Sequence, residues 1–492
     1  MTETVQILRG GRIVDPANGL DVVGDVGIKG GKIAWVGDTH QTKDADVIDV
    51  SGCVVTAGLV DVHIHAYGII GFAYPDRCGV YQGVTSFVDA GSAGVTTFHE
   101  MSALLEDSLI TDLYAGVMLR PLGLVGVDYE EGDIRSIPNL PMDGWLDLAE
   151  NHSDKFKYVK TGAIYSYGPG VIKLGKGLAE ILGVPLYLHT GELDGPKPGA
   201  VTADAYSISE KGDMITHCYH GNPGGILDEN GKLLPEVKDA ARRGVLLDVG
   251  FGSFNFSFDV AERALAQDLP PALISSDLQQ INVTGPCYSL TNVMSIFLML
   301  GLNLSEVIER ATIAPARAIA IDHKAGSLTP GFPADISVLR VEEGEFEYAD
   351  VMGGSRQGNL KILPVMTFKN GQRYDADLDL AHDQRNWHWH IAEEKIPTVA
   401  ETLGPAQREF LGALAAQLET LDWKGNCVDI PAANKLNDCF YRTKEQVGIS
   451  LQDSLRAVHN IFFEDPFTYQ LGLLLMRTPK QFAIERMRSV AA

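Results

Sequence analysis

Two histidines stand two positions apart in the segment Asp61-Val62-His63-Ile64-His65, which has the apolar character of a buried strand. Side chains two residues apart on a strand point to the same face, so His63 and His65 would converge on one point. Two neutral imidazoles on a rigid strand supply half of the ligands of a four-coordinate zinc site. The pair alone leaves open whether these histidines bind metal or only pack near the end of a strand.

Three more residues of metal-binding types follow apolar, strand-like runs elsewhere in the chain. They are His189, His217 and Asp277, which follow the runs 185–188, 214–216 and 273–276. In parallel (β/α)8 barrels the catalytic groups lie at the carboxyl ends of the strands. Four strands that end in metal-ligand types therefore predict a metal site at one mouth of a barrel.

The segment that contains these residues has the length and the alternation of such a barrel. Its eight strand-like runs are 58–63, 85–89, 115–119, 158–161, 185–189, 214–217, 246–249 and 273–276. Helical periodicity lies between several of them, for example at 171–182 and 236–243. Eight parallel strands with intervening helices close a barrel of about 250 residues. We therefore predict an α/β protein with a (β/α)8 TIM-like barrel over residues 58–322.

The two flanks of the barrel have a different texture. Short β-branched runs separated by glycine pairs, such as Gly30-Gly31, fill residues 1–57 and return at 323–375. We expect these flanks, although far apart in sequence, to pair into one small composite β-sandwich beside the barrel.

Residues 376–492 are helical in pattern. Pro405 suits the first turn of a helix, and Ser450 with Asp453 resembles a capping box. One apolar stripe at helical spacing consists of Phe410, Leu411, Leu414, Leu418 and Leu421. We predict an all-α C-terminal domain over this range.

Composition excludes several classes of protein. The 492 residues are 45% hydrophobic and 21% charged, as in globular proteins, and 40 basic against 64 acidic residues give a net charge of −24. That charge repels phosphate backbones and anionic lipids, so we expect a small-molecule substrate and neither a nucleic-acid nor a membrane partner. The longest mainly apolar stretch, Val293–Leu304, is shorter than the roughly 20 residues that span a bilayer.

The cellular compartment is predicted from two further features. The N-terminal segment lacks the basic start and the apolar core of a signal peptide. The six cysteines are scattered without a CxxC pair, which favours reduced thiols. A cytoplasmic enzyme fits both features.

Several segments form a pattern more specific than the ligand spacing. They are Thr56–His65, Gly83-Val84-Thr85, Asp89–Gly94, Thr216-His217-Cys218, 311–318 and Gly331–Asp335. In these segments residues 1–372 resemble the amidohydrolase superfamily of metal-dependent hydrolases, and more narrowly its amidohydrolase/deacetylase group. The resemblance implies the barrel, and it implies that Gly331–Asp335 opens the returning part of the β-sandwich.

The resemblance also implies two divalent metal ions, usually zinc, bridged by a hydroxide and a carbamylated lysine. Lys160 is the candidate for that lysine, and Lys157 is its competitor. One metal is then assigned to His63, His65 and Asp277, and the other to His189 and His217. His220, three residues after His217, is an alternative ligand or a substrate contact.

The implied activity is hydrolysis of an amide or ester, of the deacetylase or deacylase type, in a small substrate that carries a carboxylate. Asp277 would accept a proton from the attacking hydroxide and pass it to the leaving group. Arg120, at the end of the run 115–119, is a candidate for binding the substrate carboxylate, or else a surface arginine in a loop. Two alternatives stay open: a cyclic amide or lactone hydrolase of the dihydroorotase or hydantoinase type, and a non-catalytic scaffold.

The C-terminal region carries its own resemblance. The segments Arg385-Asn386-Trp387, 407–411, Gly448-Ile449-Ser450 and 482–486 are similar to the helical C-terminal domain of class I lysyl-tRNA synthetases. A nucleotide-binding motif and a basic face are both missing from this sequence, so we expect a structural role or homo-oligomer formation through these helices. A second HxH, Trp387-His388-Trp389-His390, is interpreted as a packing strip and not as a metal site.

Overall fold

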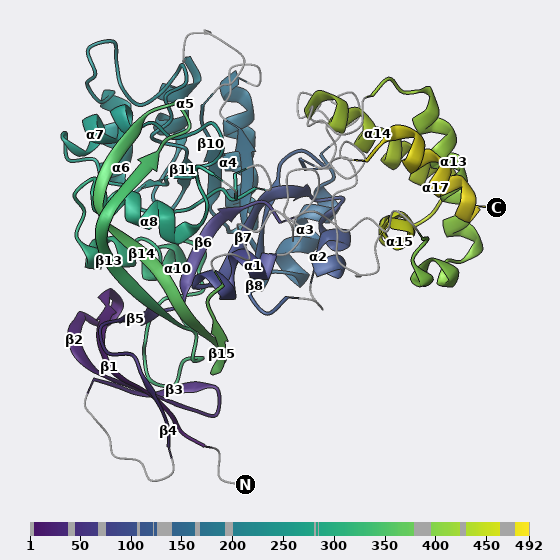
Figure 1. The fold of residues 1–492 in the computed structure, drawn as a ribbon. Helices are drawn as coiled ribbons and strands as arrows, with labels where there is room; N and C mark the ends of the chain where they lie inside the picture. The colour runs from purple at the N-terminus through teal and green to yellow at the C-terminus, as the bar shows by residue number, and fades with distance from the viewer. Residues whose placement is uncertain are drawn as a thin grey trace.

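The computed structural model describes most of the chain (Figure 1). The described residues are 4–37, 45–66, 75–105, 109–121, 123–124, 140–162, 168–191, 200–279, 282–283, 285–377, 395–423, 430–462 and 478–491. The second HxH at 387–390 and the segment 385–387 lie outside these residues.

Seven parallel strands form a curled sheet in sequence order. They are β6 (Leu59–Ile64), β7 (Val84–Gly94), β8 (Asp112–Met118), β9 (Phe156–Gly162), β10 (Leu186–His189), β11 (Met214–Thr216) and β12 (Leu246–Leu247). Nearly every residue of these strands is buried, as expected for a parallel sheet covered on both faces. The sheet is the wall of the barrel.

The segment 273–278 occupies the eighth position and closes the barrel. Leu273 forms a parallel bridge with Asp248, and Leu278 forms one with Ile64 on the first strand. The predicted strand at this place is not regular, because the backbone N–H of Ser276 donates to the Asp61 carboxylate (3.1 Å) and not to a strand carbonyl. The α/β prediction with a TIM-like barrel is otherwise confirmed.

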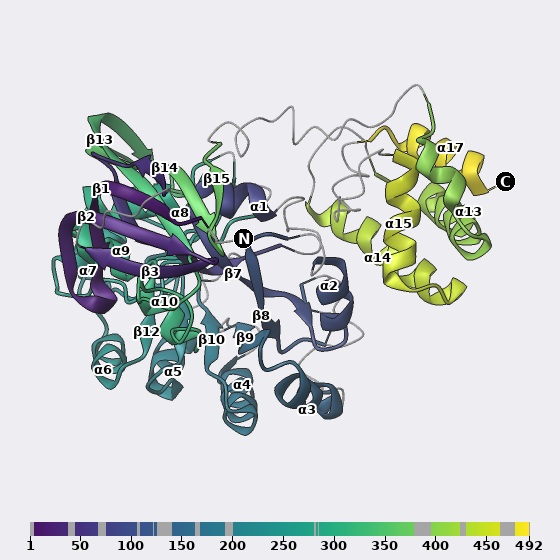
Figure 2. The same ribbon diagram turned by 90° about the horizontal axis from the view of Figure 1, so that it is seen from below.

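Helices surround the barrel strands, as Figure 2 shows for α2 to α6. They are α1 (Pro75–Cys78), α2 (Phe98–Leu105), α3 (Met142–Asn151), α4 (Gly168–Leu182), α5 (Ala200–Ile208), α6 (Pro235–Arg243), α7 (Phe258–Leu265), α8 (Leu290–Met299), α9 (Leu304–Glu309) and α10 (Ile313–Ala318), with a 3-10 turn η2 (Val80–Gln82). Local sequence explains where several of them begin: α8 is capped by Ser289, which accepts from Asn292 N, and α9 by an Asn303–Glu306 capping box. Helix α4 buries residues spaced three and four apart.

Both flanks contribute to one eight-stranded mixed sheet. Its strands are β1 (Gln6–Asp15), β2 (Leu20–Lys29), β3 (Lys32–Gly37), β4 (Asp46–Asp49), β5 (Val54–Ala57), β13 (Ile336–Ala349), β14 (Ser355–Lys369) and β15 (Gln372–Asp375), and a 3-10 turn η1 (Pro16–Asn18) joins β1 to β2. The flanks meet where β13 pairs antiparallel with β5. Gly30 and Gly31, with φ of 59° and 72°, form the tight turn between β2 and β3 that the glycine pair predicts. The composite β unit of the predicted fold class is therefore present, with a core of its own drawn from both flanks.

The hairpin of β13 and β14 extends beyond this sheet and runs along the barrel (Figure 1). Tyr348 and Ile362 are buried in the same apolar cluster as the barrel helices. The Ile362 N–H donates to Ser295 Oγ on α8 (2.9 Å), and Asp350 at the hairpin tip accepts from Phe258 N at the start of α7 (2.9 Å). The hairpin thus fastens the flank sheet to the barrel.

The C-terminal region contains η4 (Thr398–Thr402) and the helices α13 (Pro405–Thr420), α14 (Ile430–Val447), α15 (Leu451–Phe462) and α17 (Lys480–Ala491). Pro405 is at the first position of α13, and Ser450 Oγ accepts from Asp453 N at the start of α15, as the sequence predicts. Of the predicted stripe, Phe410, Leu411, Leu414 and Leu418 are buried, whereas Leu421 ends α13 as its C-cap. None of the helices in the described ranges has the length and hydropathy to cross a membrane. The domain boundaries and a role in oligomer formation stay predictions.

A buried lysine of the flank sheet forms ion pairs with two aspartates, one of the flank and one at the start of a barrel strand. Lys369 Nζ on β14 lies 2.6 Å from Asp335 Oδ2 and 2.9 Å from Asp112 Oδ2, at the start of β8. Lys369 and Asp335 are both buried. Removing one partner of such a pair leaves an uncompensated buried charge, which costs more than the pair itself contributes.

We expect Lys369→Met to lower the free energy of unfolding by about 3 kcal/mol, because Asp335 is left without its cation. The measurement is the midpoint of urea unfolding followed by circular dichroism. Lys211→Met, at an exposed lysine, is the control and should change stability by less than about 0.5 kcal/mol. Equal midpoints for the two variants would contradict a stabilising role of the pair.

Candidate metal centre at the carboxyl end of the barrel

The predicted ligands come from five positions around the barrel. His63 lies in β6 and His65 one residue beyond it, Lys160 lies in β9, His189 ends β10, His217 follows β11, and Asp277 lies in the closing segment. His217 and Asp277 have φ of 63° and 49°, so the chain turns sharply where these side chains leave the barrel wall.

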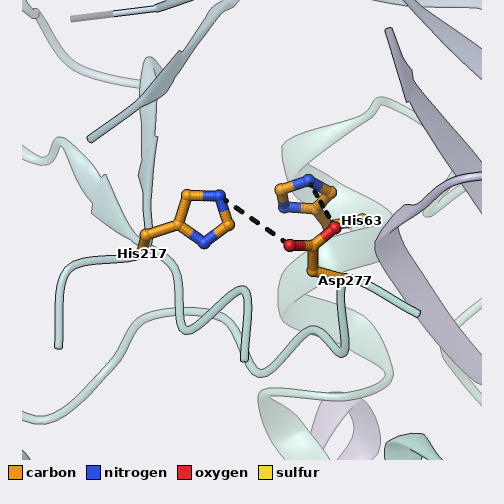
Figure 3. Close-up of side chains that lie close together, drawn as sticks. All are labelled: His63, His217 and Asp277. Carbon is orange, nitrogen blue, oxygen red and sulfur yellow. Dashed lines mark ion pairs between the residues drawn. The ribbon is translucent and has the colours of Figure 1, made fainter. Parts of the chain in front are cut away.

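One carboxylate faces three imidazoles. Asp277 Oδ1 lies 3.4 Å from His63 Nε2 and 3.3 Å from His65 Nε2, and Asp277 Oδ2 lies 4.0 Å from His217 Nε2. Figure 3 shows the rings of His63 and His217, each linked to a different oxygen of this carboxylate. All three imidazoles present the same ring nitrogen, and all four side chains are buried.

Lys160 and His189 extend the cluster. Lys160 Nζ lies 3.4 Å from His63 Nε2, and the ring centroids of His189 and His217 are 4.5 Å apart. The structure therefore brings all six predicted metal ligands into one group, of which five are buried and His189 is half-buried. Lys157, the competing lysine, lies elsewhere: its Nζ donates to Ser153 O (3.1 Å) and lies 5.1 Å from the centre of the Tyr114 ring.

Burial disfavours the charged forms of three histidines and of the lysine in the cluster. Desolvation lowers the pKa of His63 and of His217 well below the usual value, and it lowers the pKa of His189 to about 3. Desolvation also lowers the pKa of Lys160 to about 7. Neutral imidazole is the form that binds metals, because its second nitrogen keeps a lone pair.

Hydrogen bonds assign that lone pair to Nε2 of His63. Its Nδ1 lies 3.1 Å from both the Tyr187 hydroxyl and Thr216 Oγ1. Both hydroxyls donate to Asp248 Oδ2, at 2.5 and 2.7 Å, so they can only accept from His63. The proton of His63 is therefore on Nδ1, and its Nε2 lone pair faces Asp277.

His217 is oriented in the same way by the backbone. Its Nδ1 lies 2.6 Å from the Gly250 carbonyl oxygen, which can only accept, so Nε2 again carries the lone pair. A lone pair that faces a carboxylate oxygen is repelled unless a cation lies between them. Zinc ligands at about 2.0–2.1 Å in tetrahedral geometry stand about 3.3 Å apart, close to the distances that separate Asp277 from His63 and His65. This donor set fits a divalent metal.

Glycine makes room for the carboxylate. Gly252 has a φ of 63°, and a Cβ there would lie 2.5 Å from Asp277 Oδ2. A side chain at this position would therefore displace Asp277 as well as strain the backbone.

Two further predicted site residues are His220 and Arg120. His220 is buried beside Gly191, and its Nδ1 has no hydrogen-bond partner among the residues that the structure describes. Burial lowers the pKa of His220 to about 4. Arg120 is also buried, and its Nη2 donates to Gly123 O (2.6 Å), on the loop that follows β8. A role of either residue in substrate binding stays a prediction.

Sequence reasoning missed the residues that orient the histidines. Asp248, which also accepts from Ser275 Oγ (2.7 Å), stands in the apolar run 245–249, and a lone carboxylate in a buried strand was the available signal. Asp61 opens the segment Asp61–His65, but its type and spacing alone do not indicate its contacts. It accepts from His63 N (3.2 Å) and from Ser276, and burial raises its pKa to about 7.

Known proteins resemble this chain over most of its length. A sequence profile of the Amidohydrolase family matches residues 228–373. A deacetylase of Agrobacterium fabrum is 34% identical over 330 residues, which are 66% of this chain and 79% of that protein. A deacetylase of Enterococcus faecalis is 31% identical over 365 residues, which are 73% of this chain and 96% of that protein.

Solved structures agree with the fold described above. A structure of an adenine deaminase superposes with a TM-score of 0.68 at 29% identity, and covers 75% of this chain and 99% of its own. A structure of a dihydroorotase superposes with a TM-score of 0.67 at 29% identity, and covers 76% of this chain and 99% of its own.

We expect Thr216→Val to weaken metal binding about 10- to 100-fold, because it removes one of the two groups that fix the Nδ1 proton of His63. The measurement is competition for the metal with a chelator of known affinity. Thr161→Val is the matched control: Thr161 is equally buried on β9, and its hydroxyl has no hydrogen-bond partner within the described ranges. Equal loss in both variants would indicate a packing effect and would contradict the orienting role.

Proposed function

This chain belongs to the amidohydrolase superfamily, and on that basis we propose that it is a binuclear metal-dependent hydrolase that removes an acyl group from a small carboxylate-bearing substrate. The relatives named deacetylase support hydrolysis of a carbon–nitrogen bond. The observation that carries the proposal is the Asp277 carboxylate, which faces the Nε2 atoms of His63 and His65 at 3.4 and 3.3 Å.

We assign one metal to His63, His65 and Asp277 and the other to His189 and His217. The first assignment is supported by the short distances to one carboxylate oxygen. The second is supported by the 4.5 Å between the two ring centroids and by the Nε2 lone pair of His217. Zinc is the metal that we expect, because imidazole and carboxylate are among its preferred ligands.

Lys160 is proposed as a carbamylated ligand shared by both metals. A lysine ammonium repels cations, but a pKa of about 7 leaves a large fraction of Lys160 as the free amine at neutral pH. The free amine adds carbon dioxide to form a carbamate and releases one proton. The resulting carbamate of Lys160 would lie next to His63 Nε2. Burial at this position disfavours the ammonium form of Lys160 and so favours the amine that reacts.

Divalent cations at this position would lower the pKa of bound water from 15.7 to about 7 and polarise the scissile carbonyl. Asp277 would accept the proton of the attacking water and transfer it to the leaving group. Its position is fixed by two hydrogen bonds, from its own N–H to His63 O (2.7 Å) and from Gln279 Nε2 to its Oδ1 (2.9 Å). His220 would bind the substrate through its Nδ1.

Two alternatives use the same barrel. Hydrolysis of a cyclic amide is favoured by the likeness to the dihydroorotase structure, and it would need the same metal chemistry. A non-catalytic scaffold that binds no metal is disfavoured by the site itself, because neutral lone pairs that face a buried carboxylate are repulsive and a bound cation removes that repulsion.

The test of substrate class is a screen of N-acetyl, O-acetyl and cyclic-amide carboxylic acids with the zinc-loaded enzyme. We expect release of the acyl group from a linear substrate, and loss of that activity after chelation. Asp277→Asn should keep the fold and lower kcat by at least about 10²-fold, since proton transfer contributes about 10²–10⁴-fold. Turnover of cyclic amides alone would select the alternative. Full activity of Asp277→Asn would remove this residue from the mechanism.

The proposed carbamate gives a separate prediction. Enzyme incubated with ¹³C-bicarbonate should give one carbamate signal in its ¹³C NMR spectrum, and Lys160→Ala should lack that signal and lose metal. Lys157→Ala, three residues away on the same strand, should keep both. A signal that persists in Lys160→Ala would place the modification elsewhere.

A further inference from the structure

A second cluster of metal-binding side chains lies on the outer surface of the barrel. His99 is on α2, Asp147 is on α3, and His152 is the C-cap residue of α3. The two helices lie side by side in both Figure 1 and Figure 2.

Both imidazoles face the same carboxylate oxygen. Asp147 Oδ2 lies 3.2 Å from His99 Nε2 and 3.8 Å from His152 Nε2. One donor atom from each residue falls within 4.8 Å of the other two. These distances are near the spacing of about 3.3 Å expected between ligands of a tetrahedral zinc ion.

Neighbouring residues hold the three side chains in place. Asn151 Nδ2 donates to Asp147 Oδ1 (2.7 Å), which leaves Oδ2 directed at the histidines. The buried Phe98 ring contacts both imidazoles edge-on, with centroid distances of 5.5 Å to each. The backbone N–H of His152 donates to Leu148 O (3.1 Å). Little side-chain entropy would therefore be lost when a cation binds.

Two imidazoles that converge on one carboxylate oxygen form the kind of donor set that a shared cation requires. The centroids of the two imidazole rings are 4.9 Å apart. A single divalent cation would use both Nε2 lone pairs and the carboxylate together. The side chains of His99, Asp147 and His152 are 56%, 39% and 34% exposed, so water can complete the coordination sphere.

We propose that His99, Asp147 and His152 form a surface site for a divalent cation of the zinc type, separate from the metal centre in the barrel. The site connects α2, which follows β7, to α3, which precedes β9, and so bridges the two helices that flank β8. It would stabilise the packing of this part of the barrel wall, which includes the strand that carries Lys160.

The test uses the full-length protein with the barrel centre loaded with zinc and excess metal removed. Isothermal titration with Zn²⁺ should reveal one further site in the wild type and in His323→Ala, a control at an exposed histidine outside the cluster. His99→Ala, His152→Ala and Asp147→Asn should each bind at this site at least tenfold more weakly. Added Zn²⁺ should also raise the melting temperature of the wild type and of His323→Ala, and not that of the three variants.

Three variants on two helices guard against a folding defect in any one of them, and circular dichroism identifies a variant that fails to fold. Isotherms of the folded variants that match the wild type would overturn the proposal. Because the readout is binding to enzyme already loaded in the barrel, that outcome would leave the proposed hydrolase activity untouched.

Discussion

The barrel centre depends on one electrostatic constraint: a buried carboxylate faces imidazole lone pairs. Hydrogen bonds to Nδ1 fix the tautomers of His63 and His217, so neither ring can donate a proton to Asp277 through Nε2. Burial disfavours protonation of these rings. A divalent cation between the groups would remove this repulsion, and we therefore expect folding and metal binding to be linked.

The constraint is transmitted from a second carboxylate deeper in the barrel. Asp248 Oδ2 accepts three hydroxyl hydrogen bonds, from Tyr187, Thr216 and Ser275, which come from three different positions in the barrel wall. Each hydroxyl has one proton, and once it is donated to Asp248 the oxygen can only accept. The direction of these bonds therefore sets the proton position on His63. A change at Asp248 would act on the metal ligand without contacting it.

Much of this organisation could be predicted from sequence, for reasons that individual residues make clear. The strand period of two places His63 and His65 on one face, and the odd separation of Lys157 and Lys160 places them on opposite faces. The sequence does not say which face of β9 points inward, and the choice of Lys160 came from resemblance. The hydroxyls that meet at Asp248 are far apart in the chain and meet only through barrel curvature. The eighth strand is irregular because the N–H of Ser276 donates to the side-chain carboxylate of Asp61 and not to the backbone carbonyl of a neighbouring strand.

The β13–β14 hairpin belongs to two cores at once. At its base it pairs with β5, and further along Tyr348 and Ile362 pack among the barrel helices. Met352 at its tip fills the space beside Gly221, the neighbour of His220, where an added Cβ would lie 3.1 Å from Met352 Cγ. For this reason we do not expect the barrel to fold as an independent domain. A chain cut to residues 58–322 would keep every proposed metal ligand, yet it would expose an apolar surface that the hairpin covers. Recombination between relatives of this architecture would have to exchange both flanks together with the loop that carries His220.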